Sequence, residues 1–327
     1  MNGTAPARVS VIVPTRNRSA LLREALASVR AVEGPDLALE IVVANDGSDD
    51  DTARVVAEFG AIIIDVSPPG SPAGRGTPAA RNAGLRAASG EFFTFLDDDD
   101  LWLPEHIRPH LARFRADPEL SVVVGQVVNT DEDRTPISDP WPPDFPPDWD
   151  AVRVLFRWVV QIGAFVSRMS VRESVGPFDE EDPEAYDWDW YFRIALAHRV
   201  GFLHVPCVLF RQRSVQAFRD DIDARRNAYN SSLFLRYVRQ AGGRRPPLAW
   251  LARTYLEHRG LYYWLFTNVA SARADASDEV GARRALLSAL RISPMHAIND
   301  LRRPSPFRST LQTLATRRLP RSKHRRA

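Results

Sequence analysis

The sequence Phe93-Thr-Phe-Leu-Asp-Asp-Asp-Asp-Leu-Trp102 places four consecutive carboxylates directly after an apolar, strand-like segment. Like charges this close repel one another, and burying one of them without compensation is costly. A divalent cation would resolve this conflict, because Mg²⁺ and Mn²⁺ prefer oxygen ligands and complete their coordination with water and phosphates. Asp97 and Asp99 are the candidate metal ligands. The alternative is that these aspartates are solvated and cap the following turn.

The residues before this cluster alternate between β-branched segments and amphipathic segments. Strands are predicted at Val9–Val13, Leu39–Ala44, Ala61–Val66 and Glu91–Leu96, and helices at Ser19–Val32, Asp51–Phe59 and Ala79–Ala88. This order predicts an α/β fold with a doubly wound, mostly parallel sheet and helices on both faces. Ligands bind beyond the carboxyl ends of such strands, so Pro14–Asn17, Asp46–Ser48 and Asp97–Asp100 are expected at one edge.

The second half of the chain has weaker strand signals and then only helical ones. Further strands are predicted at Leu120–Val128, at Val159–Val166 and as a pair broken at Pro206 within Phe202–Phe210; helices are predicted at Asp187–His198, Ala224–Gln240, Pro247–Ala270 and Ser277–Leu290. We therefore expect an α/β domain at 1–220, a helical appendage at 221–300 and a basic, poorly ordered tail at 301–327. That tail contains nine Arg or Lys residues and no Asp or Glu.

Composition narrows the class of protein. The 327 residues are 44% hydrophobic and 26% charged, as in ordinary soluble domains. No apolar run approaches the roughly 20 residues needed to cross a bilayer, and no secretory leader precedes the first strand. We therefore expect a cytoplasmic protein, with the tail as a candidate contact to the inner face of the cell membrane. Cys207 is the single cysteine, which excludes an internal disulfide.

Four short motifs occur in order along the chain. They are Val9-Ser-Val-Ile-Val-Pro-Thr-Arg-Asn17, Val43-Ala-Asn-Asp-Gly-Ser48, Ala80-Arg-Asn-Ala-Gly84 and Phe95-Leu-Asp-Asp-Asp-Asp100, followed later by Tyr186-Asp-Trp-Asp-Trp-Tyr-Phe-Arg193. Together they resemble the successive signatures of family 2 glycosyltransferases with the GT-A fold. The resemblance spans about Val9 to Arg213 and leaves out the helical C-terminal third.

The resemblance implies a role for each matched residue. Asp187 would be the catalytic base, and Asp97 and Asp99 would hold Mn²⁺ or Mg²⁺. Asp46 would accept a hydrogen bond from the base of the nucleotide. The remaining nucleotide-sugar-binding residues would be Pro14, Thr15, Arg16, Arg81, Asn82, Asp98, Arg211 and Arg213. The family usually places Glu before the catalytic Asp, whereas Tyr186 precedes Asp187 here, with Glu184 nearby.

The implied activity is inverting transfer of a sugar from a nucleoside diphosphate, with a UDP-sugar as the first candidate donor. The implied acceptor is a hydroxyl of a cell-surface glycan or its lipid-linked precursor, and no nucleic acid partner is expected. Two alternatives remain. A sugar nucleotidyltransferase would carry a glycine-rich basic loop after the first strand, which Pro14-Thr-Arg-Asn17 lacks. A non-catalytic protein of this fold would bind the nucleotide-sugar without turnover.

Overall fold

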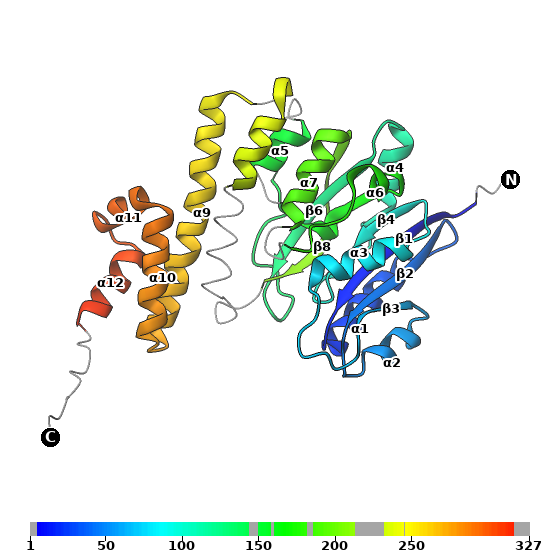
Figure 1. Cartoon of the computed structure of the whole chain (residues 1–327), viewed down its shortest axis with the longest axis horizontal. Coiled ribbons are helices and arrows are strands. Elements are labelled where there is room, and N and C mark those ends of the chain that lie inside the picture. Colours follow the sequence, from blue (N-terminus) through cyan, green and yellow to red (C-terminus); the bar gives the residue numbers. More distant parts are fainter. Residues whose placement is uncertain are drawn as a thin grey trace. The chain divides into compact units, whose positions relative to one another are not determined.

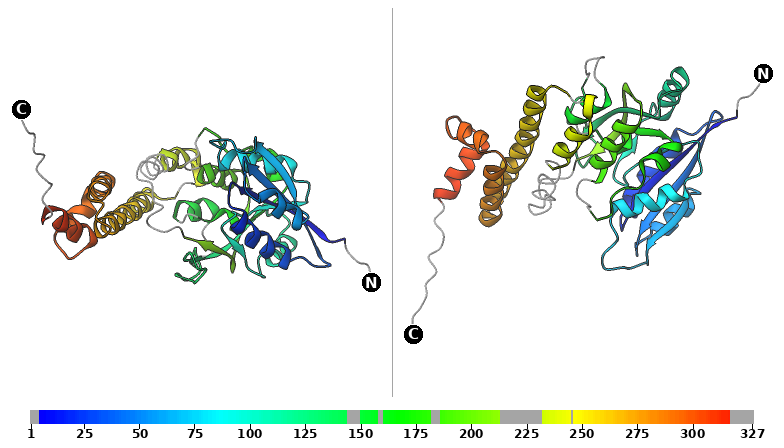
Figure 2. Two further views of the ribbon diagram at one scale, coloured as in Figure 1. Left: turned by 90° about the horizontal axis from the view of Figure 1, so that it is seen from below. Right: turned by 45° about the horizontal axis from the view of Figure 1, so that its top comes forward.

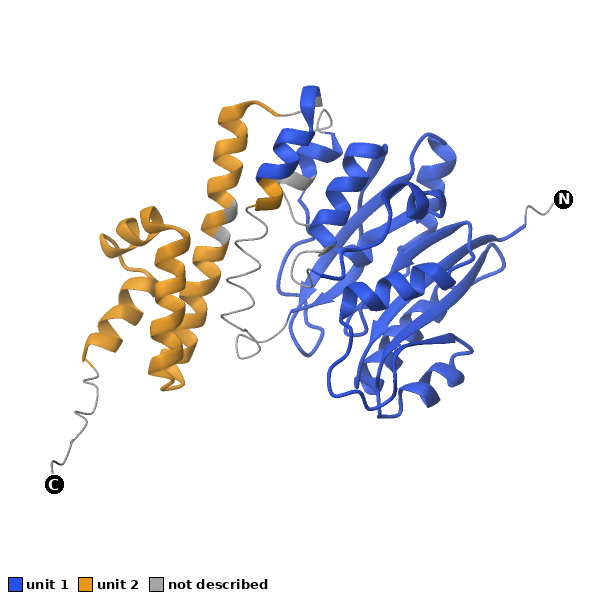
Figure 3. Cartoon of the chain, viewed as in Figure 1, with its two compact units in different colours: residues 1–212, 235–245 blue, residues 213–234, 246–327 orange. Residues whose placement is uncertain are grey.

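The computed structural model describes residues 5–143, 150–157, 160–181, 186–212, 232–244 and 246–316. The chain divides into two compact units, shown in different colours in Figure 3. Unit 1 contains residues 1–212 and 235–245, and unit 2 contains residues 213–234 and 246–327. Each unit has its own hydrophobic core.

The first half of unit 1 is a parallel βα repeat. Its elements are β1 (Ala7–Thr15), α1 (Ser19–Ala31), β2 (Leu37–Asp46), α2 (Thr52–Glu58), β3 (Ile62–Ser67), α3 (Thr77–Ala87) and β4 (Phe92–Phe95). The pairs β1–β2, β1–β4 and β2–β3 are all parallel. The predicted elements of this half are therefore confirmed, with boundaries that differ by a few residues.

The second half of unit 1 completes an eight-stranded sheet of order β3-β2-β1-β4-β7-β6-β8-β5. Its elements are β5 (Leu101–Trp102), α4 (Ile107–Ala116), β6 (Val122–Thr130), α5 (Ala151–Arg157), a 3₁₀ turn at Ile162–Ala164, β7 (Phe165–Arg168), α6 (Ser170–Val175), α7 (Tyr186–Ala197) and β8 (Val200–Arg211). Strand β7 runs antiparallel between β4 and β6. The sheet is thus mixed at this point and mostly parallel elsewhere.

Two strand predictions in this half are wrong. In the predicted strand Val159–Val166, Val159 lies outside the described residues. Among residues 160–166, only Phe165 and Val166 belong to a strand, because residues 162–164 form the 3₁₀ turn. Strand β8 also continues through Pro206 instead of breaking into a pair. Pro206 lies opposite Gln126, where the register of β6 against β8 shifts. Such an irregularity accommodates a residue without a backbone N–H inside a sheet.

Helices cover both faces of the sheet, as Figures 1 and 2 show. Val11 and Val13 of β1 belong to the same buried cluster as Leu26 of α1. The neighbouring Ile12 packs instead against Gly84 of α3, where an added Cβ would lie 2.4 Å from Ile12 Cγ2. Because successive strand residues point to opposite faces, α1 and α3 lie on opposite sides of β1. The predicted class, an α/β fold with a mostly parallel sheet, helices on both faces and further helices toward the C-terminus, is confirmed (Figure 1).

Unit 2 is helical in its described part. It contains α9 (Leu248–Asp275), α10 (Glu279–Ile292), α11 (Pro294–Leu301) and α12 (Pro306–Thr316). The Asp278 side chain caps α10 by accepting a hydrogen bond of 2.9 Å from Gly281 N. Helix α12 lies within the stretch expected to be a poorly ordered tail. Among the helices that the structure describes, none has the length and apolar character that a membrane span requires.

Candidate active site

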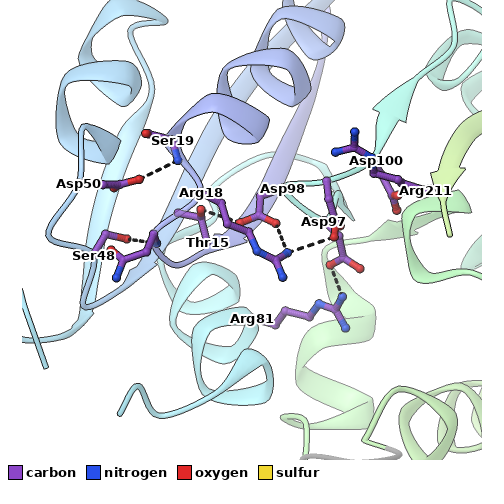
Figure 4. Close-up of polar contacts among 12 residues, drawn as sticks. Thr15, Arg18, Ser19, Ser48, Asp50, Arg81, Asp97, Asp98, Asp100 and Arg211 are labelled. Atoms are coloured by element: carbon purple, nitrogen blue, oxygen red, sulfur yellow. Dashed lines mark hydrogen bonds and ion pairs between the residues drawn. The ribbon is translucent and has the colours of Figure 1, made fainter. Parts of the chain in front are cut away.

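The loops after β1 and β2 are tied together at the carboxyl edge of the sheet (Figure 4). The Asn17 backbone, at φ 51°, donates to Ser48 Oγ at 3.0 Å, and its side chain accepts from Asp49 N at 2.9 Å. Ser19 N at the start of α1 donates to Asp50 Oδ2 at 2.8 Å. Asparagine tolerates the left-handed conformation better than most residues. The turn at Asn17 therefore fixes the direction in which the following residue, Arg18, leaves the sheet.

Arg18 lies between two of the four consecutive aspartates. Its Nη1 atom is 3.0 Å from Asp98 Oδ1 and 3.0 Å from Asp99 Oδ2. The other oxygen of Asp98 accepts a hydrogen bond of 2.7 Å from the Thr15 hydroxyl. Within unit 1, an arginine thus supplies part of the positive charge that the aspartate cluster requires.

Burial raises the pKa of two of these aspartates. It raises the pKa of Asp98 to about 6, although the Arg18 charge and the Thr15 hydrogen bond act in the opposite direction. Burial also holds the pKa of Asp100 well above its usual range, and the nearby Asp97 charge adds to this effect. Asp100 accepts a hydrogen bond of 2.9 Å from Arg211 N. The aspartates of the cluster therefore differ in how easily they ionise, and burial makes ionisation of Asp98 and Asp100 harder.

Asp97 has a different cationic partner from Asp98 and Asp99. Its Oδ1 atom lies 2.5 Å from Arg81 Nη2, and the Arg81 side chain is only 2% exposed. Arg81 comes from the middle of α3, and its guanidinium also lies 5.6 Å from the centre of the Phe95 ring. We expected Asp97 and Asp99 to turn toward one ion. In this structure, they face two different arginines.

Asn82 holds a neighbouring loop in place. Its side chain exchanges hydrogen bonds of 2.8 and 2.9 Å with the Phe178 backbone and donates to Glu180 Oε1 at 2.9 Å. Glu180 in turn pairs with Arg75 at 2.8 Å. Asn82 is 3% exposed. In this structure, both polar atoms of its side-chain amide therefore bond to the protein itself.

Asp46, at the end of β2, is enclosed by the segment that follows β3. Its carboxylate accepts from Ser67 Oγ at 2.7 Å and from the backbone N–H groups of Arg75 and Gly76 at 2.9 and 2.8 Å. A Cβ at Gly74 would lie 2.1 Å from Asp46 Oδ2. Only glycine therefore permits this close approach of backbone to carboxylate.

The remaining candidate residues lie on the same edge or outside the described part. Pro14 and Thr15 end β1 and are buried, and Arg16 donates to Ser71 O at 2.7 Å. Arg211, at the end of β8, donates from Nε to Glu132 O at 3.0 Å. Arg213 and Glu184 lie outside the described residues. The strand-end rule thus brings most of the predicted residues to one edge.

Asp187 lies in the first turn of α7 and is partly exposed, and its Oδ1 atom accepts from Trp188 N at 2.8 Å. Asp189 forms a salt bridge of 2.8 Å with Arg193, four residues later on the same helix. Asp189 also accepts a hydrogen bond of 2.6 Å from the Tyr237 hydroxyl. The two acids of this helix therefore differ, because Asp189 is held by structural partners and Asp187 is more accessible.

The aspartates at the strand edge fit a hard divalent cation. The Asp97 and Asp99 side chains are 29% and 17% exposed, and Mg²⁺ or Mn²⁺ needs only one or two carboxylates beside phosphates and water. Among the described residues, the one group of three potential ligands within 4.8 Å of one another is His106, His110 and Cys207. This second group is completely buried in the core. Its sulfur and nitrogen atoms suit softer metals than those that bind diphosphates.

Sequence reasoning missed two residues that shape this edge. Arg18 directly follows the quoted motif that ends at Asn17, so its position was visible, but its pairing with Asp98 and Asp99 was not. Gly74 lies in a Pro/Gly-rich loop, and nothing in the spacing shows that its missing side chain makes room for Asp46.

Comparison with known proteins finds a matching family and a curated relative. The profile of "Glycosyl transferase family 2" matches residues 10–173, which is half of the chain. YwdF of Bacillus subtilis, described as an uncharacterised glycosyltransferase, is 28% identical over 235 residues; the alignment covers 68% of this chain and 81% of the relative.

Two solved structures share the fold along nearly the whole chain. The structure of S. aureus TarS 1–349 in complex with UDP-GlcNAc has a TM-score of 0.55 and 15% identity, covering 94% of this chain and 92% of the other. The mannosyltransferase PcManGT from Pyrobaculum calidifontis, in complex with GDP-Man and Mn²⁺, has a TM-score of 0.53 and 20% identity, covering 96% and 87%.

Proposed function

The chain belongs to glycosyltransferase family 2 and is a glycosyltransferase. We propose that it transfers a sugar from a nucleoside diphosphate and inverts the anomeric centre of that sugar. The observation that carries this proposal is the gathering of Thr15, Arg18 and the aspartates Asp97–Asp99 at one strand edge. In the reaction, a bond forms between the acceptor oxygen and the anomeric carbon. The bond from that carbon to the diphosphate breaks, and the diphosphate leaves with the electron pair.

The donor would bind at the carboxyl edge of β1, β2 and β4. Pro14, Thr15, Arg16, Asp46, Arg81, Asn82, Asp98 and Arg211 are the proposed contacts, and Arg213 is proposed from the sequence alone. Asp46 would accept a hydrogen bond from the base, and the arginines would face the diphosphate, which guanidinium groups bind well. A UDP-sugar is the first donor to test, because UDP-GlcNAc is bound in one protein of the same fold.

Asp97 and Asp99 would hold a divalent cation beside the diphosphate. When bound, the cation supplies Lewis-acid stabilisation of the charge that grows on the leaving group. The support is the hard oxygen chemistry of the two carboxylates, their partial exposure and the Mn²⁺ present in a protein of the same fold. The arginines now paired with them would help to bind the negative diphosphate.

Asp187 would be the general base. It would remove the acceptor hydroxyl proton as that oxygen attacks the sugar from the face opposite the diphosphate. Its partial exposure in the first turn of α7 supports this role, since a base must reach the acceptor. Asp189 is less suited, because Arg193 and Tyr237 both engage its carboxylate.

The acceptor is proposed to be a hydroxyl of a cell-surface glycan or of its lipid-linked precursor, with no nucleic acid involved. The acceptor-binding surface would come from Gln126 to Ser174, which follows the aspartate cluster in the chain. The protein would act in the cytoplasm, and the basic tail after Leu301 would contact the inner face of the membrane through charge.

A thermal-shift screen of nucleotide-sugars, with and without Mn²⁺ or Mg²⁺, tests this proposal. A donor that binds the native state raises Tm, and we expect that increase to require the metal. The donor found in this way is then incubated with candidate acceptors, and release of nucleoside diphosphate is measured. Release of pyrophosphate from a nucleoside triphosphate would identify a nucleotidyltransferase instead. Donor binding without turnover on any acceptor would favour a non-catalytic protein.

A further inference from the structure

Helix α10 carries a stripe of exposed side chains that alternates between apolar residues and arginines. Val280 and Leu287 are 70% and 54% exposed, and Arg284 and Arg291 are also exposed. The spacing i, i+4, i+7, i+11 places these four residues on one face of the helix. Ala282, Ala285, Leu286 and Ala289 form the other face and are buried in the core of unit 2. The stripe therefore points away from the core of its own unit.

Helix α11, which directly follows α10, adds exposed apolar residues but no arginine. Met295 and Ile298 are 68% and 44% exposed, while Ala297 between them is buried. We call Val280, Arg284, Leu287, Arg291, Met295 and Ile298 together the α10–α11 surface. Single exposed apolar residues are common on proteins. The repeated pairing of an exposed apolar residue with an arginine along α10, followed by exposed apolar residues on α11, is more specific, since it combines two kinds of attraction.

The charge of this region is positive on balance. Residues 278–316, from the cap of α10 to the end of α12, contain six arginines and three acids, Asp278, Glu279 and Asp300. Asp300 contacts Arg303 at 3.3 Å and accepts a hydrogen bond of 2.9 Å from the Tyr263 hydroxyl. Within the described part of the chain, Arg284 and Arg291 form no ion pair. Their charges therefore remain available to a negative partner.

The chemistry of the surface discriminates between possible occupants. A second copy of the chain would bring arginines against arginines, which repel. A nucleic acid backbone would pair with the arginines and leave the apolar side chains in water. A bilayer with anionic lipids satisfies both groups, because arginines bind the phosphate headgroups while apolar side chains enter the acyl boundary.

We propose that the α10–α11 surface docks on a bilayer that contains anionic lipid. Docking then requires the apolar and the cationic side chains together, and it is distinct from a purely electrostatic contact of the tail. Lipid binding does not require sugar transfer. A failure to bind lipid would therefore leave the glycosyltransferase proposal standing, and a failure to transfer sugar would leave the lipid-docking proposal standing.

Flotation of the full chain with vesicles tests this proposal. One set of vesicles is phosphatidylcholine alone, and the other is seven parts phosphatidylcholine to three parts phosphatidylglycerol, both in about 0.1 M NaCl, where charges are screened beyond roughly 10 Å. We expect at least tenfold stronger partitioning to the anionic vesicles. The double variants Val280→Ser/Leu287→Ser and Arg284→Glu/Arg291→Glu should each weaken that partitioning at least tenfold.

Matched controls separate the surface from general changes of charge or hydrophobicity. Leu248→Ser/Leu256→Ser removes two exposed leucines of α9 in the same unit, and Arg86→Glu/Arg115→Glu makes the same change in net charge on exposed residues of unit 1. Both controls should partition within twofold of the wild type. Circular dichroism and thermal unfolding identify any variant that fails to fold, and the paired apolar and charge variants provide independent tests.

Three results would overturn the proposal. The first is absence of binding to anionic vesicles by the wild-type chain. The second is equal partitioning of both surface variants and the wild type, which would assign membrane contact to the tail. The third is a dimer in light scattering that both surface variants convert to monomers while vesicle binding persists, which would make the surface an interface between copies.

Discussion

The Thr15 hydroxyl donates a hydrogen bond of 2.7 Å to the buried Asp98 carboxylate, and this contact joins the ends of β1 and β4. The two residues are 83 positions apart in the sequence, yet they meet because parallel neighbouring strands end at the same edge of the sheet. The aspartate cluster is therefore attached to the first strand by a side chain as well as by the backbone ladder.

Replacement of Thr15 by Val should destabilise the protein by about 1–3 kcal/mol, because the shape is kept while a buried carboxylate loses a hydrogen bond. Urea unfolding at pH 8 would measure the change. Thr15→Ser retains the hydroxyl and should remain much closer to the wild type. Equal losses for the Val and Ser variants would mean that packing of the threonine methyl, and not the hydrogen bond, stabilises this edge.

Removal of the Arg18 charge should make the protein depend more strongly on metal. In Arg18→Gln, Asp98 and Asp99 lose the cation that lies 3.0 Å from each of them. We expect a lower Tm in EDTA and a larger rise in Tm on addition of Mn²⁺ than the wild type shows, because the ion replaces the missing charge. Arg86→Gln, on the exposed end of α3, controls for loss of one arginine. A smaller rise in the Arg18 variant would indicate that Arg18 supports the ion instead of competing with it.

Substitutions of Asp99 and Asp187, which have different proposed roles, should affect different measurements. Asp99→Asn should abolish the part of donor stabilisation that requires metal, because one of the two proposed ligands is lost. Asp187→Asn should keep that stabilisation and lose at least 100-fold in transfer rate, since general-base catalysis contributes about 10²–10⁴-fold. Asp133→Asn, at an exposed position, serves as the control. Exchange of the two phenotypes would reverse the assigned roles.

The fold was predictable from the sequence where it depends on local patterns. The strand cores of β1–β4 are β-branched or aromatic, and the helices between them have an apolar face. Strand β5 was not predictable, because two residues cannot show a period. Strand β7 is only four residues long and pairs with β4 some 70 positions earlier. Its antiparallel direction depends on the path of the chain through β6 and α5, which no local pattern within β7 itself can show.

The candidate site was predictable in its location and less so in its pairings. Strand ends identify the edge that holds Thr15, Asp46 and Asp98, because the rule concerns topology. The partner of a long side chain depends on rotamers, so the sequence could not show that Arg18 reaches Asp98 or that Arg81 reaches Asp97. Buried arginines are uncommon, so the sequence alone predicts an exposed position for Arg81 on its helix.

Close packing of α3 on β1 gives a prediction that is independent of the catalytic proposal. Gly84→Ala should destabilise unit 1 by about 1–3 kcal/mol, because the new methyl group overlaps Ile12 Cγ2. The double variant Gly84→Ala/Ile12→Ala should be more stable than the sum of the two single changes indicates, since removal of the isoleucine makes room for the methyl group. Additive effects in this double-mutant cycle, measured by urea unfolding, would show that the helix shifts instead of clashing.

The buried histidines of α4 should make stability depend on pH. Burial lowers the pKa of His110 to about 4 and holds that of His106 well below its usual range. In the unfolded chain, histidine has a pKa near 6.5 and becomes protonated below that pH, whereas the buried histidines of the native state stay neutral. The free energy of unfolding therefore falls as pH decreases from about 6.5 toward 4. For His110, the loss of unfolding free energy between pH 8 and pH 5 is on the order of 2 kcal/mol.

His110→Gln should reduce this pH-dependent loss of stability by that amount, whereas His204→Gln, at an exposed position, should leave it unchanged. An identical pH dependence of Tm and urea midpoint in wild type and His110→Gln would show that His110 is protonated in the native state or that other groups set the dependence.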